Sequence, residues 1–519
     1  MLKRLLYACA LFISVFASSA VMAQITSGSI TGFIKTPEGK SLEGASVKAV
    51  HEPTGTVYGT VSKSNGQFIL PNLRVGGPYT VTIQYVGLAT KKLSDLSVIL
   101  GTPVNIDITM DNGSNLSDVT VNTTKKGIIS SQRTGTSTLI SSRTIQALPT
   151  INRSVQDIAR LTPQAKVGNS ASTGAGAGVS FAGQSNRYNQ FSIDGANAND
   201  GFGLAGSGTN GGQAGLNPVS MEAIQEMQIV LAPYDVSQGG FTGGGINAVT
   251  KSGTNQFHGA AYGQYQNQNY VGKSQQYDPS VTRNAYPNFT NSTFGASLGG
   301  AIIKNKLFFY VNAERFKKSV PLAFDPTDPG SGSKVNTRTL DSLRNYLINT
   351  YHNDPGGYGG ISAETQSTSF FGRIDYNISD KHKLVVRFNH VDGTSDNLSR
   401  TATTSLFANG GYVYRDNTNS AVAELNSSFS SKLSNVLRFT YTNVNDNNGS
   451  KSPFPNVTIY QTNADNAANI TYKIGTDVSY GANGLKQNTF TVTDNLTVYQ
   501  GKHTMTFGFN GELFKSNNI

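Results

Sequence analysis

Apolar and polar side chains alternate along the second half of the chain, from Gln256 onward. In the stretch NKLFFYVNAERF, one face carries Leu307, Phe309, Val311 and Ala313, and the other carries Asn312 and Glu314 together with Phe308 and Tyr310. The stretches FFGRIDYNI, KLVVRFNH and TMTFGFNGEL repeat this period of two. Because successive side chains of a β-strand point to opposite faces, the pattern predicts strands with one apolar and one polar face.

The connections between these strands alternate in length. About nine strands are predicted, and the short turns KNK, SDKH, SSKLS and YQGK alternate with long loops near residues 267–290, 318–366, 393–418 and 446–486. This asymmetry is typical of transmembrane β-barrels, whereas a soluble sandwich shares the alternation but seldom the loop pattern. Asp494 departs from the rule, because it lies on the apolar face with Val492 and Leu496. A bulge or a position in the interfacial girdle would account for it.

A separate β-rich region precedes the alternating half, from Gly28 to about Met110. The strand-like runs SITGFIK, ASVKAVH, VYGTVS, GQFILPNL and YTVTIQYVG are separated by TPEGKSLEG and SKSNGQ, which carry the Gly, Pro and Asn of tight turns. The length and pattern predict one small β-sandwich over residues 24–110.

A polar linker, residues 111–127, follows the sandwich. It contains one β-prone island, Asp118-Val119-Thr120-Val121-Asn122. We interpret the island as an exposed, extended segment. The alternative is that it forms a last edge strand of the sandwich.

Residues 128–253 predict a mixed α+β domain. SSRTIQALP and NRSVQDIARLTP are typical of short capped helices that end near proline. The glycine-rich run that follows contains VSFAG and FSIDG, which free linkers rarely carry, so we expect a folded domain with irregular loops. Asp194-Gly195 is a natural hairpin turn.

Glycines crowd the stretch GGFTGGGINAVT just before the first alternating strand. They are Gly239, Gly240, Gly243, Gly244 and Gly245. Glycine inside a strand lowers stability unless another group approaches the backbone closely, so we expect a close backbone contact in this segment. A flexible loop is the alternative, and the β-branched run INAVT argues against it.

The N-terminus predicts export. Lys3 and Arg4 precede an apolar stretch and the small residues Val21-Met22-Ala23, which indicates a secretory signal over residues 1–23. Cys9, the one cysteine, lies inside this signal, so the mature chain is expected to have neither disulfides nor thiol chemistry.

Charge and motifs give little sign of an enzyme. The formal charge of +10 comes from scattered Lys and Arg without a nucleic-acid module. Histidines 51, 258, 352, 382, 390 and 503 are isolated and lack metal-ligand spacing. NQNYVGKS lacks the first glycine of a phosphate loop, and GAGAGVSFAG is a poor dinucleotide motif. We therefore predict no catalysis, no cofactor, no metal site and no nucleic-acid partner.

The order of these parts resembles a TonB-dependent outer-membrane receptor of the Oar-like kind. SITGFIKTPEGKSLEGASV resembles the carboxypeptidase regulatory-like domain, an accessory module related to carbohydrate-binding folds. FSIDGANANDGFGLAGSGTNGGQ, MEAIQEMQIVLAPYDVSQGGFTGGGINAVTKSGTNQFHGAAYG and TDNLTVYQGKHTMTFG carry the rest of the resemblance. It implies a globular plug, residues 128–253, inside a transmembrane β-barrel that begins at residue 254.

The resemblance also implies roles for several segments. The island Asp118–Asn122 resembles a TonB box, which would bind its partner by adding a strand to the partner's sheet. The five glycines would mark the plug–barrel junction, where a plug strand packs against the inner wall of the barrel and the chain then turns into that wall. Asp194, Gly195, Asn197, Asn199 and Asp200 are candidates for the ligand-facing side of the plug.

The function that follows is active uptake across a bacterial outer membrane, with a periplasmic N-terminal domain and the plug gated by a pull from TonB. The substrate stays open among siderophore, glycan, peptide and protein, and so does a surface lipoprotein partner. The alternatives are a surface-binding or adhesion protein without transport, and a signal-transducing receptor.

The predicted strand count bears on chain length. Nine is odd, whereas bacterial single-chain barrels are even, and large plugged transporters have about 22 strands. We therefore expect this sequence to be the N-terminal part of a longer receptor. Roughly thirteen further strands would complete a barrel of that class.

Overall fold

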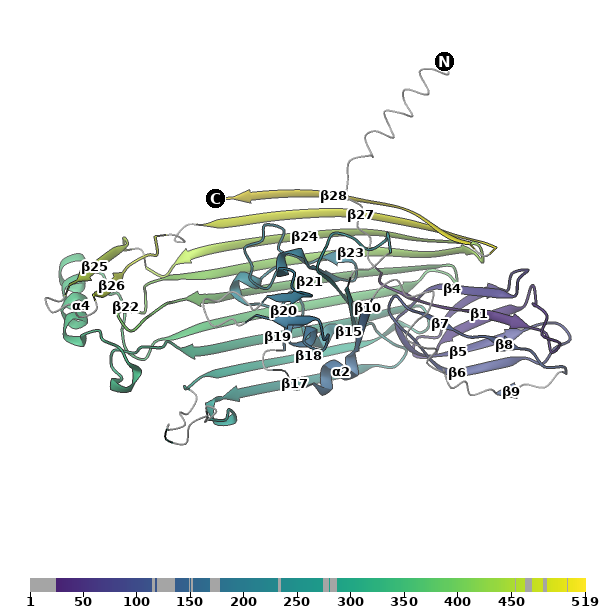
Figure 1. The fold of residues 1–519 in the computed structure, drawn as a ribbon, viewed down its shortest axis with the longest axis horizontal. Coiled ribbons are helices and arrows are strands. Elements are labelled where there is room, and N and C mark those ends of the chain that lie inside the picture. Colours follow the sequence, from purple (N-terminus) through teal and green to yellow (C-terminus); the bar gives the residue numbers. More distant parts are fainter. Residues whose placement is uncertain are drawn as a thin grey trace, which may run out of the picture.

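A computed structural model describes residues 25–113, 117–118, 136–148, 150, 153–168, 178–231, 235–273, 280, 287–452, 454–462, 469–478, 483–501 and 503–519. It contains a sandwich, a plug that lies on one face of a large sheet, and that sheet, which we call the wall (Figure 1). The predicted signal, residues 1–23, and Val119–Asn122 of the island lie outside the described residues.

The sandwich consists of two sheets, β4-β1-β7 and β3-β2-β5-β6-β9, with β8 paired to β1. Its strands are β1 (Gly28–Lys35), β2 (Ser46–His51), β3 (Thr56–Val61), β4 (Gln67–Leu73), β5 (Gly76–Gln84), β6 (Lys91–Val98), β7 (Pro103–Asn105), β8 (Ile108–Thr109) and β9 (Ser117–Asp118). Ile30, Phe68 and Tyr79 are fully buried in one core. The five strand-like runs that the sequence predicted are all strands.

The plug is built on the sheet β10-β15-β16-β13-β14 and a two-stranded sheet, β11-β12. Its elements are β10 (Thr136–Ser141), α2 (Ser142–Ala147), α3 (Val155–Ala159), β11 (Ala165–Val167), β12 (Val179–Phe181), η1 (Asn186–Tyr188), β13 (Gln190–Ile193), β14 (Ala196–Asn197), η2 (Gly212–Ala214), η3 (Met221–Ala223), β15 (Ile224–Leu231) and β16 (Gly244–Thr250). Both predicted helices form. Ser141 caps α2, and Ser154 with Asp157 makes a capping box on α3.

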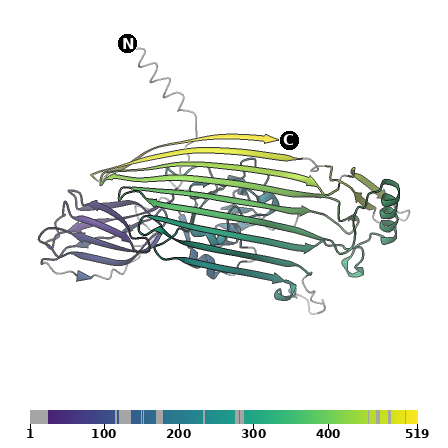
Figure 2. The same ribbon diagram turned by 180° about the vertical axis from the view of Figure 1, so that it is seen from behind.

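The wall is one antiparallel sheet of nine strands among the described residues. In spatial order they are β17 (His258–Asn267), β18 (Thr290–Ile303), β19 (Leu307–Pro321), β20 (Ser362–Asn377), β21 (His382–Asn397), β23 (Tyr412–Ser430), β24 (Leu433–Ser450), β27 (Gly484–Gln500) and β28 (His503–Asn518). Figure 2 shows them side by side, with the plug behind them and the sandwich at one end. The predicted strand number and the positions of the long loops agree with this sheet.

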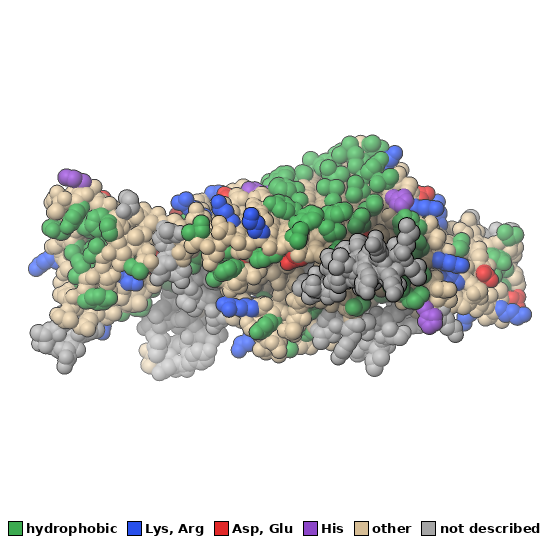
Figure 3. Space-filling model, turned by 90° about the horizontal axis from the view of Figure 1, so that it is seen from above, with side chains coloured by type: hydrophobic (Ala, Val, Ile, Leu, Met, Phe, Trp, Pro, Cys, Tyr) green, Lys and Arg blue, Asp and Glu red, His purple; other side chains and the backbone are tan. Residues whose placement is uncertain are grey.

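The wall has a polar inner face and an apolar outer face, as predicted. On β20, Phe370 and Ile374 are exposed, whereas Arg373 and Asp375 are buried on the inner face. Figure 3 shows hydrophobic side chains gathered over one area between the sandwich and the loops at the opposite end. This arrangement is that of a membrane-facing β-sheet.

Asp494, the exception in the sequence pattern, lies on the outer face. The register between β24 and β27 runs through it without a shift, so there is no bulge. Nδ2 of Asn435 donates to Oδ1 of Asp494 at 2.6 Å. Asn435 is the third residue of β24, which places it near a short turn and favours the girdle position over the bulge.

The two ends of the wall differ. Short turns at 304–306, 378–381 and 431–432 and a turn at Gly501 define the turn end, where the sandwich lies, and the longer connections define the loop end. No helix among the described residues is long and apolar enough to cross a membrane.

Three connections at the loop end fold together into one unit. It comprises α4 (Thr337–Tyr351), β22 (Thr404–Leu406), β25 (Val457–Gln461) and β26 (Ile470–Ile474), while η4 (Gln268–Tyr270) and η5 (Pro329–Ser331) lie in neighbouring loop segments. The strands form a sheet, β22-β26-β25, and Leu340 and Leu347 of α4 share a core with Phe407 and Tyr472. We call this the loop unit.

Candidate functional site

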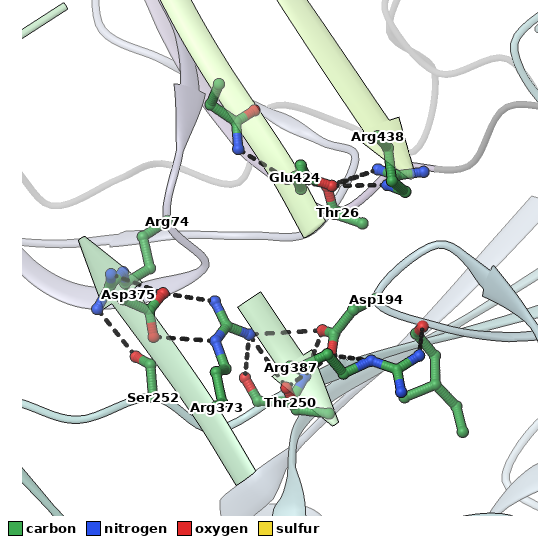
Figure 4. Close-up of polar contacts among 12 residues, drawn as sticks. Thr26, Arg74, Asp194, Thr250, Ser252, Arg373, Asp375, Arg387, Glu424 and Arg438 are labelled. Carbon is green, nitrogen blue, oxygen red and sulfur yellow. Dashed lines mark hydrogen bonds and ion pairs between the residues drawn. The ribbon is translucent and has the colours of Figure 1, made fainter. Parts of the chain in front are cut away.

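A group of charged side chains is buried on the inner face of the wall, toward the turn end. These are Arg373 and Asp375 on β20, Arg387 on β21, Glu424 on β23 and Arg438 on β24, each 8% exposed or less. They alternate with outward apolar residues, which explains why each strand points its charge inward. Buried ions are tolerated only with partners. Together with Asp194 of the plug they form what we call the charged network (Figure 4).

Asp194 is the plug's contribution to the network. It lies 3.5 Å from Nη1 of Arg373 and 3.2 Å from Nε of Arg387, measured from its two carboxylate oxygens. Thr250 of β16 donates to the same carboxylate, through its N–H at 2.9 Å and its hydroxyl at 2.7 Å. The acid is therefore shared between two wall arginines and the central strand of the plug.

The turn that presents Asp194 confirms the predicted hairpin. Asp194 and Gly195 have φ of +46° and +75°, and they join β13 to β14 with Ile193 opposite Ala196. Two successive positive φ values are typical of a type I′ turn. A Cβ on Gly195 would lie 2.1 Å from Nη1 of Arg438, so glycine is required both by conformation and by the wall.

The sandwich also enters the network. Nη2 of Arg74 lies 2.9 Å from Oδ1 of Asp375, which Arg373 grips through two hydrogen bonds of 3.0 and 2.8 Å. Thr26 donates to Glu424 at 3.0 Å, and Glu424 pairs with Arg438 at 2.6 Å. Side chains of sandwich, plug and wall are thus linked in one region.

Two further titratable groups lie near the contacts between the sandwich and the rest of the chain. Burial raises the pKa of Glu226 on β15 to about 7, against the opposing effect of the Leu100 N–H. Burial, and then the charge of Arg74, lower the pKa of His51 to about 3, so this histidine is neutral. His51 shares a 2.7 Å hydrogen bond with Thr54.

The junction glycines make close contacts, but with the plug itself. A Cβ on Gly244 or Gly245 would lie 2.5 or 2.7 Å from the rings of Phe181 and Phe241, and one on Gly243 would meet Asn189 at 2.3 Å. Gly239 and Gly240 precede β16, and Gly240 has φ +83°. The nearest neighbours of Gly243, Gly244 and Gly245 therefore belong to the plug and not to the wall, since β16 is an inner strand of the plug sheet. The assignment of the five glycines to the plug–barrel junction stays a prediction.

The close approach to the wall occurs further along. A Cβ on Gly253 would lie 2.3 Å from the carbonyl oxygen of Phe309 and 2.5 Å from that of Gly300. Gly253 lies three residues after the glycine-rich stretch. A single glycine in a polar turn does not by itself indicate a close contact with another strand.

The other ligand-face candidates are held in local turns. Asn197 accepts from the N–H of Asn199 at 2.9 Å, and Asn199 accepts from that of Phe191 at 2.6 Å. Asp200 accepts from the backbone of Phe202 and of Ala205. Their assignment to a ligand face stays a prediction.

A cavity of about 620 Å³ lies between the plug and the part of the wall toward the loop end. Its lining includes three cationic side chains, Arg153 and Arg160 from the plug and Lys318 from β19, with Glu314 among the anionic ones. The sequence analysis placed Glu314 on the polar face of its strand but missed the three cations, because each is an ordinary surface-type charge whose common location depends on the fold.

The island is described only at its start. Ser117 and Asp118 form β9, which pairs in parallel with Lys91 and Lys92 of β6 at the sandwich edge. This pairing favours the edge-strand alternative for these two residues. Among the described residues, no group of three or more His, Cys, Asp or Glu side chains is arranged to hold a metal ion.

Three family descriptions match successive parts of the chain. The carboxypeptidase regulatory-like domain matches residues 29–111, the TonB-dependent receptor plug domain matches 130–246, and an outer membrane beta barrel domain matches 249–519. The TonB-dependent transporter Oar of Myxococcus xanthus is 28% identical over 263 residues, which cover 48% of this chain and 22% of the relative.

Among the solved structures similar to this chain, one with a TM-score above 0.5 shows the same fold. The outer membrane transporter YddB from Escherichia coli has a TM-score of 0.51 at 13% identity, over 74% of this chain and 48% of that one. The siderophore receptor PirA from Acinetobacter baumannii has a TM-score of 0.46 at 15% identity over the same shares. The chain therefore spans about half the length of these structures and about a fifth of the curated relative.

Proposed function

The chain belongs to the TonB-dependent outer-membrane receptors, and from this premise we propose that it takes up a substrate across the outer membrane through a barrel that the plug closes at rest. The turn end then faces the periplasm and the loop end faces outward, because barrels of this class have short periplasmic turns and long external loops.

The observation that carries the proposal is the way the plug is held. Asp194 meets Arg373 and Arg387 of the wall, so ionic and hydrogen-bonded contacts join the two domains. When the plug moves, water can replace these polar contacts. Separation of two purely apolar surfaces would instead cost about 25 cal/mol of free energy for each Å² of apolar surface that becomes exposed. The network suits a plug that is seated firmly and released as a unit.

The substrate would enter from the loop end. The cavity beside the plug has a volume of about 620 Å³, which is in the range of small-molecule sites. We assign this cavity to the substrate and leave its identity open among siderophore, glycan and peptide, with a protein substrate confined to the outer loops.

The energising partner would be TonB, which the family name implies. An extended island can bind by β-augmentation, in which main-chain hydrogen bonds do most of the binding. Release of Ser117–Asp118 from β6 would free the island for this pairing. The proposed transport requires no bond chemistry of the receptor itself.

Uptake measurements test the proposal. Cells that produce the receptor are supplied with a panel of labelled ferric siderophores, oligosaccharides and peptides, with and without a protonophore. We expect at least one compound to accumulate only in energised cells. Surface binding without energised accumulation of any compound would instead favour the adhesion alternative, for which the folded loop unit offers a binding surface.

A further inference from the structure

The sandwich is seated on the turn end of the wall. The N–H of Asn255, between plug and wall, donates to the carbonyl of Pro53 at 2.7 Å. Nδ2 of Asn377, the last residue of β20, donates to the hydroxyl of Thr56 at 2.9 Å. The sandwich loop around residues 53–56 is therefore held by the wall and by the segment that leads into it.

A second contact joins the sandwich to the plug and is mainly apolar. Val75 and Leu100 of the sandwich share a cluster with Val249 of β16, and Ile25 packs against it. Nε2 of Gln228 on β15 donates to the carbonyl of Leu100 at 3.2 Å. The sandwich thus contacts plug and wall at the same time.

The third contact is ionic and reaches the charged network itself. Arg74 pairs with Asp375 at 2.9 Å and donates to Ser252 at 3.0 Å, and its side chain is only 14% exposed. Thr26 donates to both oxygens of Glu424. Removal of the sandwich would take a cation from one buried wall carboxylate and a hydroxyl donor from another.

We propose that the sandwich is a latch that closes the turn end, with Arg74 as the positioning residue. While docked, Arg74 helps to fix Asp375, which orients Arg373 toward Asp194 of the plug. Undocking withdraws Arg74, leaves Asp375 with one cation fewer, and weakens the hold of the wall on the plug. Docking and plug retention are thereby coupled through shared side chains.

The order of the chain favours this coupling. The island lies between the sandwich and the plug in the sequence, so a pull on it acts on both. Latch release would be part of the transport step, and in this respect the inference rests on the proposed function.

Reversible cross-linking tests the latch. Thr56→Cys and Asn377→Cys place thiols on two side chains that now share a hydrogen bond, and Cys9 of the predicted signal is the one native cysteine. A reducible bismaleimide is applied to intact cells. A protease site inserted in the linker at 123–127 then shows on a gel whether the two halves remain joined.

We expect efficient cross-linking in resting cells, at least a tenfold fall in energised uptake, and recovery after reduction. The control is Ser46→Cys with Gln84→Cys, an exposed cross-strand pair within the sandwich that leaves the docking contacts free. The latch is overturned by a lack of cross-linking in resting cells, or by uptake equal to that of the control pair.

A second measurement judges the latch without transport. In the purified receptor, Arg74→Ala should raise deuterium exchange in β16 about tenfold, leave exchange in β2 and β5 unchanged, and be partly rescued by Arg74→Lys. Unchanged exchange in β16 would refute the role of Arg74. If no form of the receptor accumulates any compound while Arg74→Ala still loosens β16, the proposed function fails and the latch stands.

Discussion

Replacement of Asp194 by asparagine should loosen the plug without unfolding the wall. The two arginines that face Asp194 are not equally dependent on it. Arg373 keeps its two hydrogen bonds to Asp375. Arg387 is 1% exposed, and besides its contact with Asp194 it donates to the carbonyl of Ile193 at 2.7 Å and to the hydroxyl of Ser420 at 3.3 Å.

The size of the effect follows from this asymmetry. A buried ion that loses its only counter-ion destabilises the folded state by about 3–5 kcal/mol. For plug opening this corresponds to an increase of roughly two to three and a half orders of magnitude in the open population. The double variant Asp194→Asn with Arg387→Met should recover most of the loss, because it removes the orphaned cation and conserves side-chain volume.

Hydrogen–deuterium exchange of β16 in the purified receptor measures this opening. Asp200→Asn is the matched control, since Asp200 is a plug carboxylate that accepts from backbone N–H groups of its own turn. Its effect should be about 1 kcal/mol. Protection of β16 in Asp194→Asn within threefold of the wild type, or a double variant no better than the single one, would refute the reasoning.

Three other changes probe separate features. Gly195→Ala should lower plug stability more than Gly203→Ala, because both glycines have positive φ but only Gly195 faces an arginine within 2.1 Å of a new Cβ; thermal unfolding of the two variants makes the comparison, and equal melting temperatures would contradict it. Deletion of Asp118–Asn122 should abolish energised uptake and preserve surface binding, and normal accumulation by the deletion variant would exclude a role of the island. The contact between the sandwich and the plug should weaken as pH rises from 4.5 through about 7, because burial raises the pKa of Glu226 and its protonated form is favoured in place. The weakening is at most about 3 kcal/mol, and Glu226→Gln should remove it. The cross-linking yield of the pair Thr56→Cys with Asn377→Cys measures the contact, and a yield independent of pH with Glu226 present would count against the prediction.

Most of the wall could be predicted from the sequence. A strand with lipid on one side and the plug on the other must alternate apolar and polar side chains. The sequence pattern therefore places Phe308, Tyr310 and Asn312 on one face, and in the structure all three are buried. The hairpin at Asp194 was predictable for a similar reason, because two positive φ values select for Asp-Gly.

The alternation places Arg373, Asp375 and Arg387 on the inner face, but the partner of each charge in the network could not be predicted in the same way. Arg373 and Asp194 are 179 positions apart, and nothing local to either residue indicates the other. The junction glycines are a different case. A glycine in a strand indicates that some atom lies close to the backbone, but it does not indicate which part of the chain supplies that atom. The sequence around Arg74 does not indicate its ion pair, because the partner, Asp375, belongs to another domain.

The shared core of the loop unit limits how the sequence of this unit can change during evolution. Its core joins Leu340 of one connection, Phe407 of a second and Tyr472 of a third, which are far apart in the gene. A recombination event that replaced one connection alone would bring an unmatched side chain into a core shared by all three. Recombination between relatives therefore preserves this core only if all three segments are exchanged together. Otherwise each segment can change only by small substitutions that the other two compensate. The loop unit should consequently vary as a block, even though its coding segments are interrupted by those of the wall strands.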